Sequence, residues 1–155
     1  MESRYDTYCG LYCGACDVLR ANEEGTVEQA AQEWNMKPEE LRCCGCKSTV
    51  NAVYCVECEL KKCAEAKQIE FCFKCDAFPC ERLVAFKNDE CPHHSIVLKN
   101  LELIYKNGVD TWLTDQKQRW SCSTCGTKFS WYDRVCKKCG SKLYNCEDEE
   151  KDLDK

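Results

Sequence analysis

Eighteen of the 155 residues are cysteine, and most of them stand in short, regular spacings. Six pairs have the spacing Cys-x2-Cys, which places two sulfurs on one tight turn, where both can bind the same tetrahedral metal ion. A disulfide framework needs no such spacing. The sequence therefore predicts thiolate metal sites. The predicted ligands are Cys9, Cys13, Cys16, Cys43, Cys46, Cys55, Cys58, Cys63, Cys72, Cys75, Cys80, Cys122, Cys125, Cys136 and Cys139.

The last two pairs give the strongest signal of a single site. Ten residues separate the pair Cys122 and Cys125 from the pair Cys136 and Cys139, and a glycine follows each pair. Glycine suits the turn in which backbone N–H groups bond to sulfur. We predict a zinc-ribbon or rubredoxin-like unit with a short strand over residues 128–132. Zinc is the expected ion, and iron is the alternative because both metals accept four thiolates.

The N-terminal cysteines allow several ways of sharing metal ions. Twelve cysteines precede residue 90, so three four-cysteine sites are the maximum there, and we expect roughly three to four zinc ions in the whole chain. Cross-braced pairings fit as well as pairings of neighbouring turns. The neighbouring-turn pairing places Cys13 and Cys16 with Cys43 and Cys46, places Cys55 and Cys58 with Cys72 and Cys75, and leaves Cys9, Cys63 and Cys80 on a third ion.

An internal repeat supports structural sites rather than one reactive centre. Residues 55–63 and 72–80 share the spacing Cys-x2-Cys-x4-Cys, and each third cysteine opens or joins a predicted short helix, over residues 60–67 and 79–86. The order of spacings is opposite to that of plant-type ferredoxins. An iron–sulfur cluster, or iron in a redox or metal-handling role, remains the alternative cofactor at the N-terminal cysteines.

The triplet at residues 9–16 has the spacing Cys-x3-Cys-x2-Cys, which also marks the cluster loop of radical S-adenosylmethionine enzymes. The chain lacks the alternating strands and helices that a barrel enzyme needs. It also lacks a Gly-rich phosphate loop, a G-x-S-x-G turn and an H-E-x-x-H helix. These absences favour a protein that is not an enzyme.

Composition and pattern divide the chain into four parts. Residues 1–90 form a predicted cysteine-rich metal-binding domain, 91–119 a helical connector, 120–146 the zinc-ribbon unit, and 147–155 an acidic disordered tail. We expect a small metal-stabilised α+β protein with an irregular zinc-knuckle core. Aliphatic residues are sparse, so metal ions must replace much of the core, and the metal-free chain should be largely unfolded.

Three further helices follow from apolar periodicity. Thr26 and Gln29 match a capping box at the start of a helix that ends before Lys37-Pro38. Apolar residues at helical spacing predict a helix from Pro92 to residue 107 and another over 110–118. We expect these two helices to form an apolar brace between the metal-rich units.

Charge and export signals limit the classes of partner. The formal net charge is −5, and each ion held by four thiolates adds a site charge of about −2, which argues against binding mainly through nucleic-acid phosphates. No apolar stretch approaches the roughly 20 residues of a membrane span. The polar start of the chain, residues 1–6, lacks a signal-peptide pattern. We therefore expect a cytoplasmic protein that does not bind membranes.

Five metal-capable residues stay unassigned. They lack the regular spacing of the others, and their sequence context fits ordinary surface or buried positions as well as metal binding. They are Cys44, Cys91, His93, His94 and Cys146.

Four blocks of sequence resemble a known family. The blocks are Cys9-Gly-Leu-Tyr-Cys13-Gly-Ala-Cys16, then Cys43-Cys-Gly-Cys46, then Cys58-Glu-Leu-Lys-Lys-Cys63 and finally Phe71-Cys72-Phe-Lys-Cys75-Asp-Ala-Phe-Pro-Cys80. In order and spacing, residues 9–83 resemble the prokaryotic family of cysteine-rich proteins known as domain-of-unknown-function family 3795. The resemblance implies metal binding without a known activity.

The sequence favours a zinc-stabilised interaction module that binds an unidentified protein or a specific nucleic-acid structure. Closed four-cysteine sites are more often structural than reactive. The expected contact residues on the C-terminal hairpin are Phe129, Trp131, Tyr132, Arg134, Lys137 and Lys138.

Overall fold

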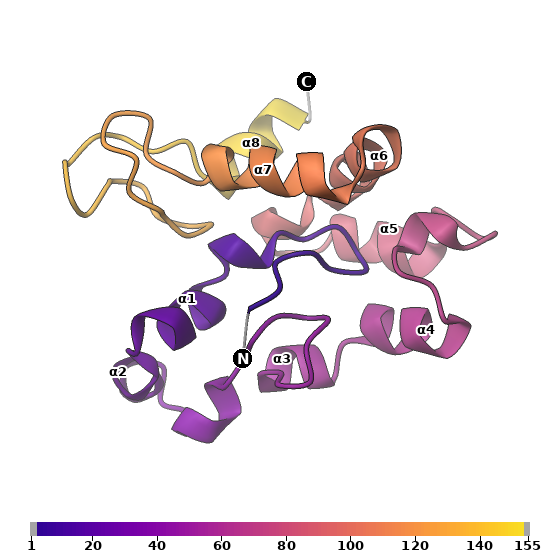
Figure 1. Ribbon diagram of the computed structural model, residues 1–155, viewed down its shortest axis with the longest axis horizontal. Coiled ribbons are helices and arrows are strands. Elements are labelled where there is room, and N and C mark those ends of the chain that lie inside the picture. Colours follow the sequence, from indigo (N-terminus) through magenta and orange to yellow (C-terminus); the bar gives the residue numbers. More distant parts are fainter. Residues whose placement is uncertain (1–2, 154–155) are drawn as a thin grey trace.

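The computed structural model describes residues 3–153, and residues 1–2 and 154–155 lie outside that range. The described chain is mostly helical (Figure 1). The α-helices are α1 (Asp17–Glu24), α2 (Val27–Glu33), α3 (Val53–Val56), α4 (Glu59–Lys67), α5 (Glu81–Lys87), α6 (Val97–Asn107), α7 (Val109–Arg119) and α8 (Cys146–Leu153). The 3-10 helices are η1 (Cys13–Ala15), η2 (Pro38–Leu41), η3 (Cys72–Lys74) and η4 (Pro92–His94).

The expected strand over residues 128–132 is wrong. Within residues 3–153, β structure consists of two isolated antiparallel bridges, Ser121 with Lys128 and Val135 with Lys142. Each bridge closes one of the two C-terminal cysteine turns, so the backbone turns back before a ladder can extend. The α+β prediction is therefore confirmed for the helices, but the described residues form only isolated bridges where strands were expected.

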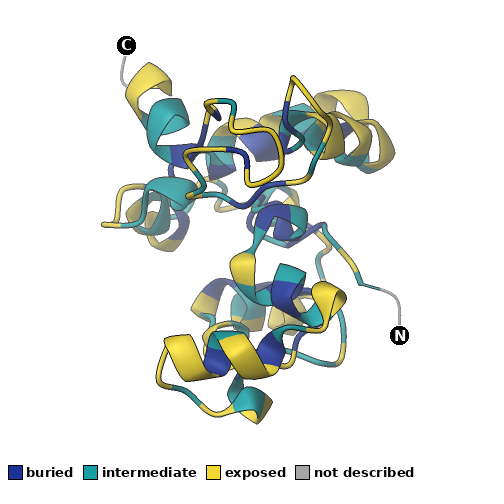
Figure 2. Ribbon diagram, turned by 90° about the vertical axis from the view of Figure 1, so that its left-hand side faces the viewer, coloured by how far each residue is buried: buried dark blue, intermediate teal, exposed yellow. Residues whose placement is uncertain are grey.

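The helices form two groups with the N-terminal segment between them. In Figure 1, α6, α7 and α8 lie above the indigo segment that leads into η1, and α1 to α4 lie below it. Figure 2 shows the same division from the side. None of the described helices combines the length and apolarity needed to cross a membrane.

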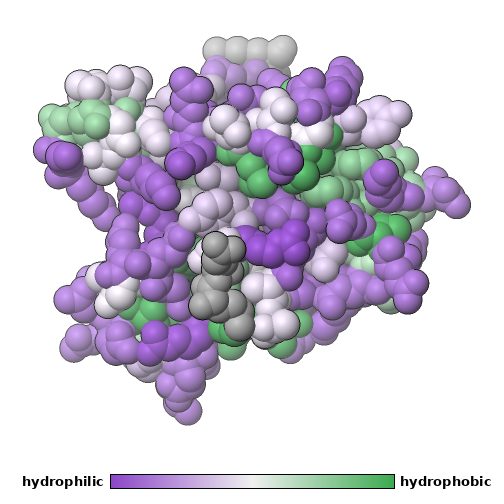
Figure 3. All heavy atoms as spheres, viewed as in Figure 1, coloured by the Kyte–Doolittle hydropathy of each residue, from purple (hydrophilic) through white to green (hydrophobic). Residues whose placement is uncertain are grey.

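The expected helical brace is present as α6 and α7. Val97, Leu101 and Ile104 recur at helical spacing and are buried in the largest apolar cluster, as predicted. Trp112 of α7 is also buried, and its ring meets the Tyr12 ring edge-on with centroids 5.9 Å apart. Apolar side chains show beside α7 on the otherwise mainly hydrophilic face of Figure 3. The brace therefore packs against the N-terminal segment.

The remaining helices bury very little apolar surface. One small cluster consists of Leu19 and Ala52 together with Cys13, Cys43 and Cys46. A second, beneath α1 and α2, is built from short aliphatic side chains and Leu41. Three of the five buried residues in the first cluster are cysteines. Metal binding by those thiols would therefore change the stability of this half of the molecule.

A buried ion pair fixes the loop that carries Cys46. The Lys47 ammonium lies 2.9 Å from the Asp6 carboxylate and 3.7 Å from the centroid of the Phe71 ring. The side chain of Lys47 is 4% exposed and that of Asp6 is 9% exposed. The contact joins three segments that are distant in sequence, those of Asp6, Lys47 and Phe71. Separating them would be costly, because it would leave a buried charge without its partner.

The start of α2 differs in detail from the expected capping box. The helix begins after Thr26, but the Thr26 side chain makes no capping hydrogen bond. A box-like cap occurs instead at η2, where the Lys37 backbone N–H donates to Glu40 Oε2 at 2.8 Å. Glu40 therefore caps the 3-10 turn that follows α2.

The predicted acidic tail is ordered as α8 through Leu153, and residues 154–155 of that tail lie outside the described residues. The Asn145 side-chain oxygen accepts the backbone N–H groups of Glu147 (3.0 Å) and Asp148 (3.3 Å), which caps the helix. Glu149 then pairs with Arg119 of α7 at 3.0 Å. Capping and this contact explain why a charged segment becomes helical.

Gly10 is the point at which the N-terminal segment touches α6. Its φ is +98°, and a Cβ at this position would lie 2.7 Å from the Val97 carbonyl oxygen and 3.0 Å from Leu101 Cγ. The Gly10 carbonyl accepts a hydrogen bond of 2.9 Å from the buried Asn100 amide. A side chain here would push the segment away from the brace.

We expect Gly10→Ala to destabilise the metal-loaded protein by about 1–3 kcal/mol more than Gly25→Ala. Gly25 also has a positive φ, of +72°, but a Cβ there meets nothing within 4 Å, so the matched pair isolates the packing clash. Urea unfolding measures the difference. Equal losses of stability in the two variants would contradict this packing.

Candidate metal centre

The four C-terminal cysteines converge on one point. Cys122 Sγ lies 3.6 Å from Cys139 Sγ, and Cys125 Sγ lies 3.6 Å from Cys136 Sγ. All four sulfurs are within 4.8 Å of one another. Sulfurs bound tetrahedrally to one ion at about 2.3 Å lie about 3.8 Å apart, whereas disulfide sulfurs lie about 2.05 Å apart. The observed spacing matches a metal site and not a disulfide.

Two nearly identical turns position these sulfurs. The Gly126 N–H donates to the Cys122 carbonyl at 2.8 Å, and the Gly140 N–H donates to the Cys136 carbonyl at 2.9 Å. The two glycines have φ values of +77° and +78°. Only glycine adopts this left-handed conformation without a steric penalty, which explains why a glycine follows each pair.

Hydroxyl groups support the second sulfur of each turn. The Thr127 hydroxyl is hydrogen-bonded to Cys125 Sγ at 3.2 Å, and the Ser141 hydroxyl to Cys139 Sγ at 3.2 Å. The Thr127 hydroxyl, followed by its backbone N–H, lowers the pKa of Cys125 to about 6. Sequence reasoning did not identify these residues, although a hydroxyl residue follows Cys-Gly in both turns.

The donor set suits a metal ion that is closed off from other ligands. Backbone N–H groups of Cys125 and Thr124 lower the pKa of Cys122, so its thiolate is favoured. Four thiolates fill a tetrahedral coordination shell and leave no position for substrate. The geometry therefore fits zinc or iron in a structural role, and no other residue is needed to complete the shell.

The hairpin between the two turns packs onto the rest of the molecule. Phe129 is buried beside Trp120, with ring centroids 5.3 Å apart. The Trp131 N–H donates to the Ala15 carbonyl at 3.1 Å, and the Trp131 ring stacks on His93 at 4.2 Å. The expectation of an exposed side chain is therefore wrong for Phe129, whereas Trp131 is partly buried.

A first N-terminal group gathers around the start of α1. The interaction with the neighbouring Cys55 thiol is the main reason that the pKa of Cys43 falls to about 6. Burial raises the pKa of Cys13, the neighbouring Cys16 raises it further, and a backbone hydrogen bond from Cys46 opposes the rise. Cys55 therefore lies with these cysteines rather than with the second copy of the repeat.

A second N-terminal group lies beneath the N-terminal segment. Burial raises the pKa of Cys9 to about 12, and the nearby charges of Cys46 and Cys58 add to this rise. Cys46 lies near members of both groups, because its charge also raises the pKa of Cys55.

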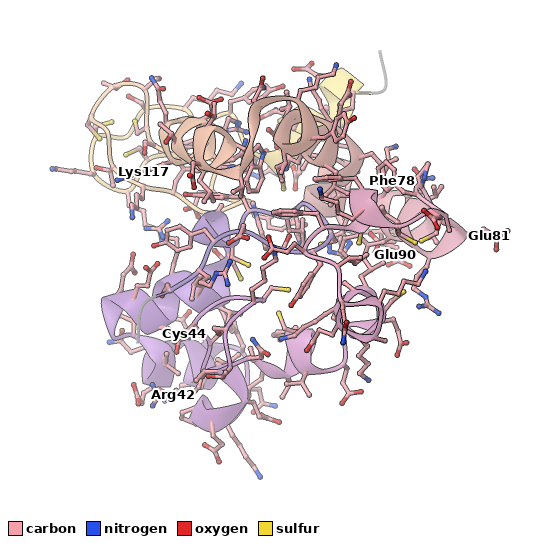
Figure 4. The ribbon with its side chains drawn as sticks, turned by 45° about the vertical axis from the view of Figure 1, so that its right-hand side comes forward. Arg42, Cys44, Phe78, Glu81, Glu90 and Lys117 are labelled. Atoms are coloured by element: carbon pink, nitrogen blue, oxygen red, sulfur yellow. The ribbon has the colours of Figure 1, made fainter. Side chains whose placement is uncertain are left out.

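A third group lines a cavity of about 630 Å³ between α4 and α5. The cavity brings together Cys63 of the first repeat with all three cysteines of the second, Cys72, Cys75 and Cys80. Lys67 lies 3.0 Å from Cys75 Sγ and lowers the pKa of that thiol. Figure 4 shows Phe78 and Glu81, which also line the cavity, at the edge of the molecule.

These three N-terminal groups are looser than the C-terminal site. In residues 3–153, no three N-terminal cysteine sulfurs lie within 4.8 Å of one another. The neighbours of Cys55 and Cys63 also differ from those in the neighbouring-turn pairing. Metal binding by the eleven predicted N-terminal ligands therefore stays a prediction, with a cross-braced pairing the better match to the structure.

A second compact set of metal-capable groups lies after α5. One ligand atom from each of Asp89, Cys91 and His94 lies within 4.8 Å of the others. Adjacent His93 points elsewhere, and its Nδ1 lies 2.7 Å from the Tyr132 hydroxyl. Cys91 and His94, unassigned from sequence, thus belong to one cluster, and Asp89 is a member that sequence reasoning missed.

Comparison with known proteins assigns the N-terminal half. The family model described as a protein of unknown function, DUF3795, matches residues 5–85, which is just over half of the chain. The chain belongs to this family. The match confirms the resemblance noted for residues 9–83 and contains all twelve N-terminal cysteines, whereas Asp89, Cys91, His94 and the four-cysteine hairpin lie beyond it. Searches of curated proteins and of solved structures found no match.

Cys125→Ser should remove one tightly held metal ion per chain, because it deletes a quarter of the converging thiolate shell. Cys44→Ser is the matched control, because the Cys44 thiol belongs to neither compact ligand set within residues 3–153. Native mass spectrometry of the full chain counts the ions. The same ion count in Cys125→Ser and in the unaltered protein would contradict the site.

The lowered pKa of His93 should make the free energy of unfolding depend on pH. Burial, reinforced by the charge of His94, lowers the pKa of His93 to about 3. The folded state thus binds fewer protons than the unfolded state, and stability falls as pH drops below about 6.5. Because the ring is only half-buried, we expect a loss of about 1 kcal/mol per pH unit or less. Urea unfolding at pH 7 and pH 5.5 should show a smaller loss in His93→Gln, and identical losses would refute this assignment.

Proposed function

We propose that this protein is a zinc-stabilised module that binds another protein. The observation that carries the proposal is the convergence of four C-terminal sulfurs with no coordination position left open. Zinc fits such a closed thiolate shell, has no redox chemistry and contributes folding energy directly. In this role the metal supports a surface and does not act on a substrate.

Charge on the hairpin favours a protein partner over nucleic acid. Arg134 is paired with Glu147 at 2.7 Å. Lys137 borders a groove of about 440 Å³ that is also lined by Asp17, Glu24 and Glu33. These acidic neighbours and the net charge of −5 oppose contact with a phosphate backbone.

An exposed apolar surface on α3 supplies a contact site. Val53, Tyr54 and Val56 are 37%, 59% and 51% exposed. Exposed apolar side chains that cluster in this way are typical of protein-interaction sites. A four-residue helix is too short to be stable alone, and Cys55 connects it to Cys43 in the first thiol group. A metal at that group would hold the apolar side chains of α3 in place.

Val56→Asp should weaken capture of a defined partner, because it places a charge in the proposed contact surface. Val135→Asp is the matched control, since Val135 has the same side chain and is 55% exposed on the metal hairpin. Affinity capture from a prokaryotic lysate, quantified by mass spectrometry, compares the two variants with the unaltered protein. Loss of the partner in Val135→Asp alone would move the contact to the hairpin, and recovery of no partner by any form would contradict the proposal.

A second candidate, iron–sulfur or redox chemistry, is favoured by one observation. Cys63, Cys72, Cys75 and Cys80 line a cavity of about 630 Å³, and their sulfurs are too dispersed for a single tetrahedral ion. A larger iron–sulfur group bound by four thiolates would suit this arrangement. Protein purified without oxygen should then show visible charge-transfer absorption. A colourless sample fully occupied by zinc would exclude this candidate.

A further inference from the structure

We propose that Asp89, Cys91 and His94 form an open site for one exchangeable divalent ion of the zinc type. This site lies outside residues 5–85 and uses none of the cysteines of the four-cysteine hairpin. It is therefore independent of the metal sites discussed above.

The distances among the three side chains suit one ion. His94 Nδ1 lies 2.7 Å and 2.9 Å from the two carboxylate oxygens of Asp89, and the Cys91 sulfur completes a set of atoms within 4.8 Å of one another. Nitrogen and oxygen ligands bound tetrahedrally at about 2.0–2.1 Å lie about 3.3 Å apart. If the Asp89 and His94 side chains moved slightly apart, the ion would fit between them.

Local structure holds the three ligands in place before an ion binds. The Cys91 backbone N–H donates to Asp89 Oδ1 at 2.9 Å, and the His94 N–H donates to the Cys91 carbonyl at 2.9 Å in η4. The His94 ring stacks on Phe86 of α5 with centroids 3.7 Å apart. Backbone hydrogen bonds and a ring contact thus orient all three donors toward a common point, as metal sites require.

The donor set predicts an ion that exchanges with solvent. One thiolate, one carboxylate and one neutral imidazole balance the charge of a divalent ion, and they leave the fourth tetrahedral position for water. The Asp89 side chain is 37% exposed and that of His94 is 13% exposed, so solvent reaches one side of the site. A mixture of sulfur, nitrogen and oxygen donors suits zinc, or cobalt as its spectroscopic substitute. Binding releases the Cys91 thiol proton to solvent.

Neighbouring residues provide matched controls. His93 is adjacent to His94, but its ring stacks on Trp131 and its Nδ1 faces Tyr132. Glu90 stands between Asp89 and Cys91 and is not a member of the compact set. Figure 4 shows Glu90 far from Cys44, which serves as the thiol control in another part of the molecule.

Cobalt(II) titration of the zinc-loaded full chain tests the site, with thiolate-to-cobalt absorption as the signal. We expect one additional ion whose affinity falls at least about tenfold in Asp89→Asn, Cys91→Ser and His94→Gln. Glu90→Gln, Cys44→Ser and His93→Gln should bind this ion as the unaltered protein does. Absence of the additional ion, or equal affinity in His94→Gln and His93→Gln, would overturn the proposal.

The same titration separates this site from the four-cysteine site. Asp89→Asn should keep the tightly held zinc, and Cys125→Ser should lose the tight ion while keeping the weaker cobalt ion. Far-ultraviolet circular dichroism reports whether each variant is folded. Loss of the weaker ion from folded Cys125→Ser would show that the two sites are one, which would also overturn the proposal.

Discussion

The convergence of four thiolates at the C-terminal turns is the constraint on which the surrounding structure depends. Two glycine turns aim Cys122, Cys125, Cys136 and Cys139 at one point, but only two isolated β-bridges accompany them. Such a hairpin has too few backbone hydrogen bonds to be stable alone. Four thiolates held within 4.8 Å of one another would repel without an ion, so a cation is what makes this arrangement favourable. The hairpin then packs Phe129 and Trp131 against the helices and positions α8.

The N-terminal half follows the same principle with less compact groups. Its helices are short, and its small apolar clusters contain several cysteines. Helices of this length gain little stability from propensity alone. The buried pair of Lys47 with Asp6 and the contact of Gly10 with α6 hold the loops between the thiol groups. Side-chain chemistry at a few points therefore replaces the continuous core of an ordinary domain of this size.

Local pattern was sufficient to predict the features that depend on nearby residues. The four-cysteine site lies within 18 residues, and its paired turns could be recognised from spacing and glycine alone. The cysteine repeat located α4 and α5, and apolar periodicity located α6 and α7, to within a few residues. The family was recognised because four blocks of cysteines keep their order and spacing.

Features that depend on tertiary neighbours could not be predicted in the same way. The interaction of Cys55 with Cys43 joins two separate cysteine turns, which spacing alone does not pair. Trp131 is covered by His93, which belongs to another predicted unit, and Phe129 is covered by Trp120 of its own unit. Asp89 was overlooked because carboxylates are common on surfaces, and only the fold of η4 brings it to Cys91 and His94.

X-ray absorption spectroscopy at the metal edge of the purified full chain tests the central claim most directly. A structural ion on Cys122, Cys125, Cys136 and Cys139 predicts a dominant sulfur shell at about 2.3 Å, which should weaken in Cys125→Ser. Zinc would identify the closed structural site, and the same shell around iron would retain the site but change its chemistry. A metal surrounded only by nitrogen and oxygen, or a folded chain that contains no metal, would contradict the account.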